Sequence, residues 1–150
     1  MENKNHEIGD SAIFYFNKGF SCSESVAKAV SLAMGCDLQN ITKIATPFSG
    51  GIASQGYICG SVSGALIALG LNNGRMSPNE DRDTCNELAR EFTHSFLREF
   101  KSLDCQDIIG VNLLTEEGRK ELKEHLRSEK CCSVVKFAAE EIYRLIKSLG

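Results

Sequence analysis

The sequence predicts an all-α fold: a compact multi-helix domain of about six to seven helices with one glycine-rich loop. Apolar residues recur at helical spacing along most of the chain, and residues that cap or end helices flank those stretches. We find no run that alternates with the period of a strand. The 150 residues, 42% hydrophobic and 25% charged, suit a single helical domain spanning residues 1–150.

Two helices are predicted at the start of the chain. Apolar residues form one stripe over residues 6–17, and Gly19 supplies a helix stop. Ser21 and Glu24 then form the Ser-x-x-Glu pattern of a capping box, in which each residue satisfies a backbone N–H of the other. This pattern predicts a second helix, which Gly35 ends.

A segment of a different kind follows at residues 46–57, TPFSGGIASQGY, which has neither a helical nor a strand period. Such a loop of roughly a dozen residues is uncommon in a compact domain and is often functional. The helix predicted after it, residues 59–71, carries small residues every four positions, at Gly60, Gly64 and Ala68. These let another backbone approach closely, either within the chain or across a homodimer interface.

The second half of the chain is also predicted to be helical. Pro78 starts a long helix, Asp104 opens a short one that Gly110 stops, and Thr115 caps another. The last helix covers about residues 131–149.

The chain has seven cysteines, and this odd number cannot pair completely within one chain. Four of them, which we call the site cysteines, are each predicted at or near a helix N-terminus: Cys22, Cys59, Cys105 and Cys131. Free N–H groups and the helix dipole stabilise a thiolate there and lower its pKa. The thiolate is the form that attacks disulfides and binds soft metals.

The remaining cysteines and the histidines give weaker signals. Cys85 lies on the apolar stripe of its helix and is predicted to be a core residue. Cys36 and Cys132 have no predicted role. The histidines form no metal or hydrolase motif, so we expect surface residues and not ligands at His6, His94 and His125.

Four short elements, one around each site cysteine, resemble the C-GCAxxG-C-C family of redox-active proteins. They are Gly-Phe-x-Cys at 19–22, Cys-Gly-Ser-Val-Ser-Gly at 59–64, Cys105 before Ile-Ile-Gly at 108–110, and Cys131 before Val135 and Ala-Ala-Glu at 138–140. Ser61 stands where the family motif has alanine. The resemblance implies redox or cluster chemistry without naming a reaction, an unknown redox partner and a link to a membrane transporter. The chain is also similar to the cluster-bearing part of split-Soret cytochromes.

The first functional hypothesis is an iron–sulfur or other metal-thiolate site for electron transfer, with the site cysteines as ligands. Zinc would match the same ligand count. The loop glycines Gly50, Gly51 and Gly56 could supply N–H donors to a cluster or thiolate sulfur, although a simple tight turn would also explain them. The candidate cofactor-binding residues are Gly50, Gly51 and Gly60.

Two alternatives need no cofactor. In a metal-free thiol–disulfide protein, Cys59, exposed by Gly60 at a helix start, would attack, and another site cysteine would resolve the mixed disulfide. In a non-catalytic accessory or interaction domain, the cysteines would be mostly core residues.

The overall charge and hydropathy exclude some partners. A net charge of -3 gives no broad basic surface for nucleic acid. The most apolar stretch, residues 60–71, is about half the ~20 residues that span a bilayer, so no membrane insertion is expected. The first residues, MENKNHEIGD, lack the apolar centre of a signal peptide, which predicts a cytoplasmic protein with reduced thiols.

Overall fold

A computed structural model describes residues 2–36 and 39–149. Over these residues the all-α prediction is confirmed: there is no strand, only an isolated bridge between Ile58 and Asp104. The elements are α1 (Glu2–Asn17), α2 (Cys22–Ala33), α3 (Ile41–Ala45), the 3-10 helix η1 (Thr46–Phe48), α4 (Gly60–Asn73), α5 (Asp83–Phe100), α6 (Cys105–Ile109), α7 (Glu116–Glu121), the π-helix η2 (Leu122–Cys131) and α8 (Cys132–Ser148).

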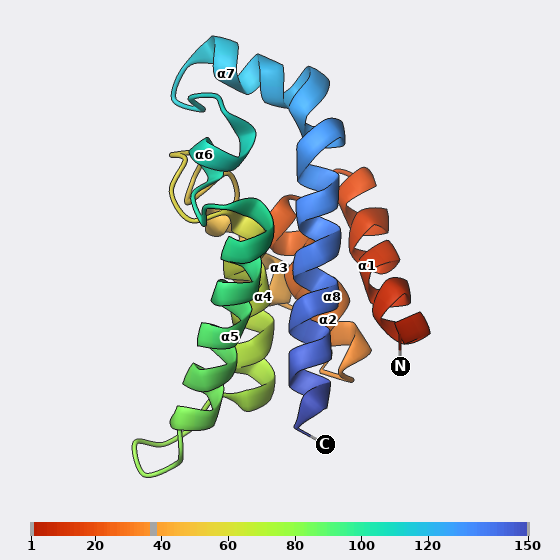
Figure 1. Ribbon diagram of the computed structural model, residues 1–150, viewed down its shortest axis with the longest axis vertical. Helices are drawn as coiled ribbons and strands as arrows, with labels where there is room; N and C mark the ends of the chain where they lie inside the picture. Colours follow the sequence, from red (N-terminus) through yellow and green to blue (C-terminus); the bar gives the residue numbers. More distant parts are fainter. Residues whose placement is uncertain (1, 37–38, 150) are drawn as a thin grey trace.

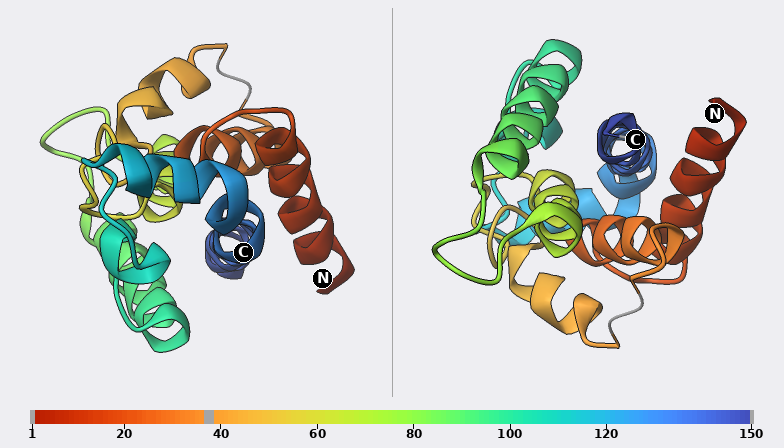
Figure 2. Two further views of the ribbon diagram at one scale, coloured as in Figure 1. Left: turned by 90° about the horizontal axis from the view of Figure 1, so that it is seen from above. Right: turned by 90° about the horizontal axis from the view of Figure 1, so that it is seen from below.

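Helix α8 is the centre of the bundle. It packs against α1, α2, α4 and α5, which lie on three sides of it when the molecule is seen end-on (Figure 2). Its inward face is fully buried at Val135, Ala138, Ile142 and Leu145. Helix α5 contributes the fully buried rings of Phe92 and Phe96, which belong to the same core. Helix α6, helix α7 and the glycine-rich loop gather at the end of the bundle away from both termini (Figure 1).

The small residues of α4 pack within the chain, against α2. A Cβ at Gly64 would overlap the carbonyl of Ser23 and lie 3.0 Å from the Ser23 Cα. A Cβ at Gly60 would overlap the Cys22 sulfur. This face of α4 is therefore occupied by α2, and a homodimer, which stays a prediction, would need another surface.

Local capping signals are confirmed at several helix ends. The Ser21 Oγ accepts the Glu24 N–H at 3.3 Å, and the Glu24 carboxylate accepts the Ser21 N–H at 2.8 Å. The Thr115 hydroxyl accepts the Gly118 N–H at 3.0 Å. Gly110 has a φ of 78°, the left-handed conformation expected of a glycine that ends a helix.

The predicted start of the long helix at Pro78 is wrong. Helix α5 begins at Asp83, because the Asp81 carboxylate accepts the N–H groups of Asp83 and Thr84 and so caps the helix later in the chain. Pro78 lies in the preceding turn. The short helix α3 was not predicted.

Helix α8 begins within one residue of the predicted start near Cys131, but the free N-terminus predicted there is wrong. Helices α7, η2 and α8 follow one another without a break from Glu116 to Ser148, and the chain bends along this path (Figure 1). Cys131 is the last residue of the π-helix, so it lies inside a continuous helix and not at a free N-terminus.

Among residues 2–36 and 39–149, no helix is both long and apolar enough to cross a bilayer.

Candidate functional site

All four site cysteines line one cavity at the loop end of the bundle, with a volume of about 150 Å³. A single water molecule needs only about 10–15 Å³ measured in this way, so the cavity has room for a much larger group. Most of its wall is apolar. The lining residues besides the site cysteines are Phe16, Ser21, Ser49, Gly50, Ser54, Ile108, Ile109, Leu122, Arg127 and Val134.

The cysteines reach this cavity from four different segments. Cys22 is the first residue of α2, Cys59 the N-cap of α4, Cys105 the first residue of α6 and Cys131 the last residue of η2. All seven cysteines are free thiols. The fold therefore assembles the site from residues that are far apart in the sequence.

Two backbone hydrogen bonds hold Cys59 and Cys105 next to each other. The Cys59 N–H donates to the Leu103 carbonyl at 2.7 Å, and the Cys105 N–H donates to the Tyr57 carbonyl at 2.6 Å. These bonds flank the isolated bridge between the chain before α4 and the chain before α6. Both residues are only 7% exposed. The exposure predicted for Cys59 is therefore wrong, because this bridge and the adjoining loop cover it.

The three glycines predicted to serve the cofactor have different positions. Gly50 lines the cavity. Gly51 lets the backbone of Tyr57 and the side chain of Cys105 pack closely against the loop. A Cβ on Gly51 would lie 2.5 Å from the Tyr57 nitrogen and 2.8 Å from the Cys105 Cβ. Gly60 allows the Cys22 sulfur to lie directly against the start of α4.

The glycine-rich loop contains five consecutive residues with positive φ, from Gly50 to Ser54. Three of them are not glycine: Ile52 at 64°, Ala53 at 49° and Ser54 at 60°. The left-handed conformation costs an L-residue roughly 1–2 kcal/mol, so the loop is strained. Backbone bonds such as Ala53 N–H to the Pro47 carbonyl, at 2.8 Å, hold it in place. Strain of this kind concentrates at functional sites.

The electrostatics of the site cysteines differ from the prediction. Burial, together with the nearby Cys22, raises the pKa of Cys105 to about 12. Burial and the neighbouring cysteines likewise raise the pKa of Cys131 to about 12, and they raise that of Cys59 further. The predicted lowering by helix N-termini is wrong, because desolvation and the mutual repulsion of thiolates outweigh the N–H groups.

Cys22 is the site cysteine that the other three share as a neighbour. A negative charge on it raises the pKa of Cys59, Cys105 and Cys131. Burial raises its own pKa, although hydrogen bonds from the backbone N–H groups of Gly50 and Ser23 partly offset this effect. That the loop supplies N–H donors to a cluster or thiolate sulfur stays a prediction.

Arg127 is a site residue that the sequence did not reveal. Its Nη2 donates to the carbonyls of Phe16 at 2.5 Å and Phe20 at 2.8 Å, and its guanidinium lies 3.5 Å from the centre of the Phe16 ring. Its charge lowers the pKa of Cys22 and Cys131, opposing the effect of burial. The only sequence signal was its position four residues before Cys131, one turn away on the same helix.

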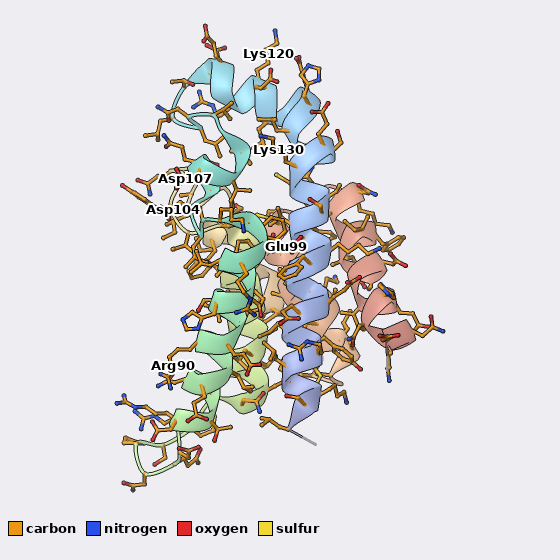
Figure 3. All side chains as sticks on the ribbon, in the orientation of Figure 1. Arg90, Glu99, Asp104, Asp107, Lys120 and Lys130 are labelled. Carbon is orange, nitrogen blue, oxygen red and sulfur yellow. The ribbon has the colours of Figure 1, made fainter. Side chains whose placement is uncertain are left out.

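Lys130, a second cation on η2, hydrogen-bonds to α6 at Ile109, which lines the cavity. The Lys130 ammonium donates to the Ile109 carbonyl at 3.4 Å, near the end of α6, where a cation suits the helix dipole. On the outer side of α6, the Asp107 carboxylate accepts the Ser102 hydroxyl at 2.8 Å. Figure 3 shows Lys130 on the η2 side of α6 and Asp107 on the other side.

The other cysteines lie outside the cavity lining. Cys85 packs at the edge of the main core, Cys36 donates its thiol to the Asn72 side chain at 3.3 Å, and Cys132 lines a separate surface pocket. The three histidines are exposed, as predicted. Within the described part of the chain, no three His, Cys, Asp or Glu side chains come close enough together to hold a single metal ion.

One protein family matches most of this chain, including all four site cysteines. The family described as "Putative redox-active protein (C_GCAxxG_C_C)" matches residues 20–145, most of the chain. The chain belongs to this family. No curated protein and no solved structure matches it, so the similarity to split-Soret cytochromes stays a prediction.

The second element of this C_GCAxxG_C_C protein has a clear structural reason for its spacing. Cys59 caps α4, and the two glycines of the element, Gly60 and Gly64, both face α2 one turn apart. Because they have no side chain, α4 can approach α2 until Cys22 and Cys59 share a cavity. Ser61, at the motif's alanine position, is fully buried.

Proposed function

We propose that the protein binds an iron–sulfur cluster in the four-cysteine cavity and transfers electrons through it. The observation that carries the proposal is that four cysteines from four separate segments line one cavity of about 150 Å³. Four thiolates match the ligand set of a [2Fe–2S] or [4Fe–4S] cluster. When bound, the cluster supplies the one-electron redox chemistry.

The chemistry of the donors supports the proposal. Thiols whose pKa is raised to about 12, as at Cys105 and Cys131, stay protonated and unreactive near neutral pH. Metal binding supplies the positive charge that such buried sulfurs lack, and it displaces their protons. Arg127 adds a cation beside Cys22 and Cys131, which favours the negative charge of a thiolate-ligated cluster.

Zinc matches the same ligand count and stays the alternative metal for this site.

The redox partner is proposed to contact the loop that covers the cavity. Two apolar side chains on this loop remain exposed, Ile52 at 39% and Tyr57 at 58%. Tyr57 immediately precedes the bridge that holds Cys59 and Cys105. A partner on this surface would approach the site through a thin layer of backbone.

Purification without oxygen, followed by visible spectroscopy and assays for iron, sulfide and zinc, tests the proposal. We expect broad visible absorption with stoichiometric iron and sulfide. Cys105→Ser should lose most of the iron, whereas Cys85→Ser, outside the cavity, should keep it. A colourless wild-type protein without iron and sulfide would overturn the cluster.

A metal-free thiol–disulfide mechanism is the second candidate, and the central position of Cys22 favours it. The Cys22 thiolate would attack a disulfide substrate and release one substrate thiolate. A second site cysteine would then attack Cys22 in the mixed disulfide and release the other substrate thiol. The substrate gains two electrons, and the protein ends as a disulfide. A colourless protein that still exchanges two electrons per chain would support this candidate.

A further inference from the structure

The loop that covers the cysteine cavity has an uncharged, partly apolar surface. No charged residue lies between Lys43 and Arg75, so the loop brings none to this end of the bundle. The Tyr57 N–H donates to the Gly51 carbonyl at 3.0 Å, which joins the parts of the loop that carry Ile52 and Tyr57, the two exposed apolar side chains. Aromatic side chains are enriched, and charged ones depleted, at the centres of protein–protein interfaces.

Helix α6 adds two carboxylates beside this surface. The helix is joined to the loop by the bridge between Ile58 and Asp104 and by the Cys105 N–H, which donates to the Tyr57 carbonyl at 2.6 Å. Asp104 precedes α6 and Asp107 belongs to it, and both are exposed. Figure 3 shows both residues on the outer side of α6. The apolar surface of the loop therefore has a negative edge.

No neighbouring side chain cancels these two charges. Among the residues that the structure describes, neither Asp104 nor Asp107 forms an ion pair. Asp104 also makes no side-chain hydrogen bond to the start of α6. The ammonium of Lys101, three residues before Asp104, donates to the Arg98 carbonyl at 2.8 Å, and Lys130 lies on the opposite, η2 side of α6.

We propose that this face docks the redox partner, and that the partner is a protein whose electron-transfer site is an apolar patch edged with lysine and arginine. The inference rests on the proposed function and names the partner of the same site. Complementary charges steer two proteins together and fix their orientation, while an uncharged centre avoids the cost of burying a charge. Docking here sets the partner against the bridge and loop that cover Cys59. One electron then passes from the reduced cluster to the oxidised partner, with no bond made or broken.

Carbodiimide cross-linking tests the docking surface without requiring a cluster, because it joins carboxylates directly to lysines in contact with them. The probe is oxidised cytochrome c, whose exposed haem edge is ringed by lysines, at an ionic strength of about 0.01 M. We expect mass spectrometry to find its lysines joined to Asp104 or Asp107, and to find these products lost near ~1 M salt. Cross-links spread evenly over the exposed carboxylates, or none at Asp104 and Asp107, would overturn the proposal.

Stopped-flow electron transfer from the reduced protein to cytochrome c measures the effect on rate. Asp104→Asn/Asp107→Asn is compared with Glu87→Gln/Glu91→Gln, which loses the same charge at two exposed sites of α5 that form no ion pair among the described residues. Figure 3 shows Arg90, which lies between these two glutamates in the sequence, far along α5 from Asp104. We expect the aspartate variant to react about tenfold more slowly than wild type at ~0.01 M salt and equally fast at ~1 M, where the charges are screened. The glutamate variant should stay within about twofold of wild type at both.

The outcomes separate this inference from the proposed function. Both variants should keep the iron and sulfide content of wild type. Equal rates for the two variants at low salt would overturn the docking surface and leave the cluster in place. A wild-type protein without iron and sulfide would overturn the cluster instead, and the cross-linking result would then decide the docking surface by itself.

Discussion

Because α2 and α4 are in close contact, alanine is expected to have different effects at two glycines of α4, Gly64 and Gly70. A methyl group at Gly64 would overlap the Ser23 carbonyl of α2 and lie 3.1 Å from its carbon. A methyl group at Gly70 would meet no atom within 4 Å. Gly64→Ala and Gly70→Ala therefore make the same chemical change in α4 with and without a neighbouring backbone.

The two substitutions should change stability in opposite directions. Alanine stabilises a helix interior by roughly 0.5–1 kcal/mol relative to glycine, and Gly70→Ala should gain about this amount. Gly64→Ala gains the same propensity, but overpacking costs typically 1–3 kcal/mol. The backbone of α2 cannot easily yield, because the Ser23 hydroxyl is bonded to the Ala45 carbonyl at 2.8 Å. A net loss of about 1–2 kcal/mol follows for Gly64→Ala.

Urea unfolding followed by far-ultraviolet circular dichroism measures both effects. The metal-free protein should be used throughout, because a ligand bound only to the folded state would add its own stabilisation. The slope of free energy against urea should stay constant while the midpoint moves down for Gly64→Ala and up for Gly70→Ala. Equal midpoints for the two variants would refute the close approach of α2 and α4.

Three further predictions concern the site and its surroundings. Arg127→Lys loses both bonds to backbone carbonyls and the stacking on Phe16, and should lower the unfolding free energy by about 1–3 kcal/mol in the same urea assay. Burial raises the pKa of Glu24, but hydrogen bonds from the Ser21 N–H and the Thr46 hydroxyl outweigh it and hold the pKa below 4.5. The resulting stabilisation of the folded state is present above pH 4.5 and is lost as the pH falls through the lower pKa of folded Glu24. Glu24→Gln has no carboxylate to protonate there, so its unfolding free energy should fall less on acidification than that of wild type. Burial raises the pKa of Cys105 to about 12, so in the reduced, metal-free protein iodoacetamide should alkylate Cys105 far more slowly than it alkylates glutathione in the same sample near neutral pH. Mass spectrometry measures the two rates. Equal rates would contradict the burial of Cys105.

Much of the helical structure could be predicted because its signals are local. Ser21 and Glu24 lie three residues apart and cap the same turn, and Gly110 ends a helix by its own backbone conformation. The start of α5 was placed too early because Pro78 favours a first helical turn wherever a helix can begin. The Asp81 carboxylate decides the start instead, through hydrogen bonds that the sequence pattern did not reveal.

The candidate site was only partly predictable, because its geometry depends on tertiary contacts. The four cysteines could be chosen by their positions near helix starts and by family resemblance, but their common cavity depends on packing between distant segments. The direction of their pKa shifts was predicted wrongly for the same reason, since burial of Cys59 and Cys105 cannot be read from neighbouring residues. Arg127 was missed because its partners, such as Phe16, lie more than a hundred positions away.

The π-helix η2 has a consequence for how the length of this chain can vary. A π-helix takes up more residues per turn than an α-helix, so Leu122–Cys131 holds more chain than the same axial distance would need in α form. Deleting one residue there can be absorbed by tightening toward the α register, without moving the buried face of α8. Related sequences should therefore place single-residue gaps in this stretch and not within α8, where a gap would rotate Val135 and Ala138 out of the core.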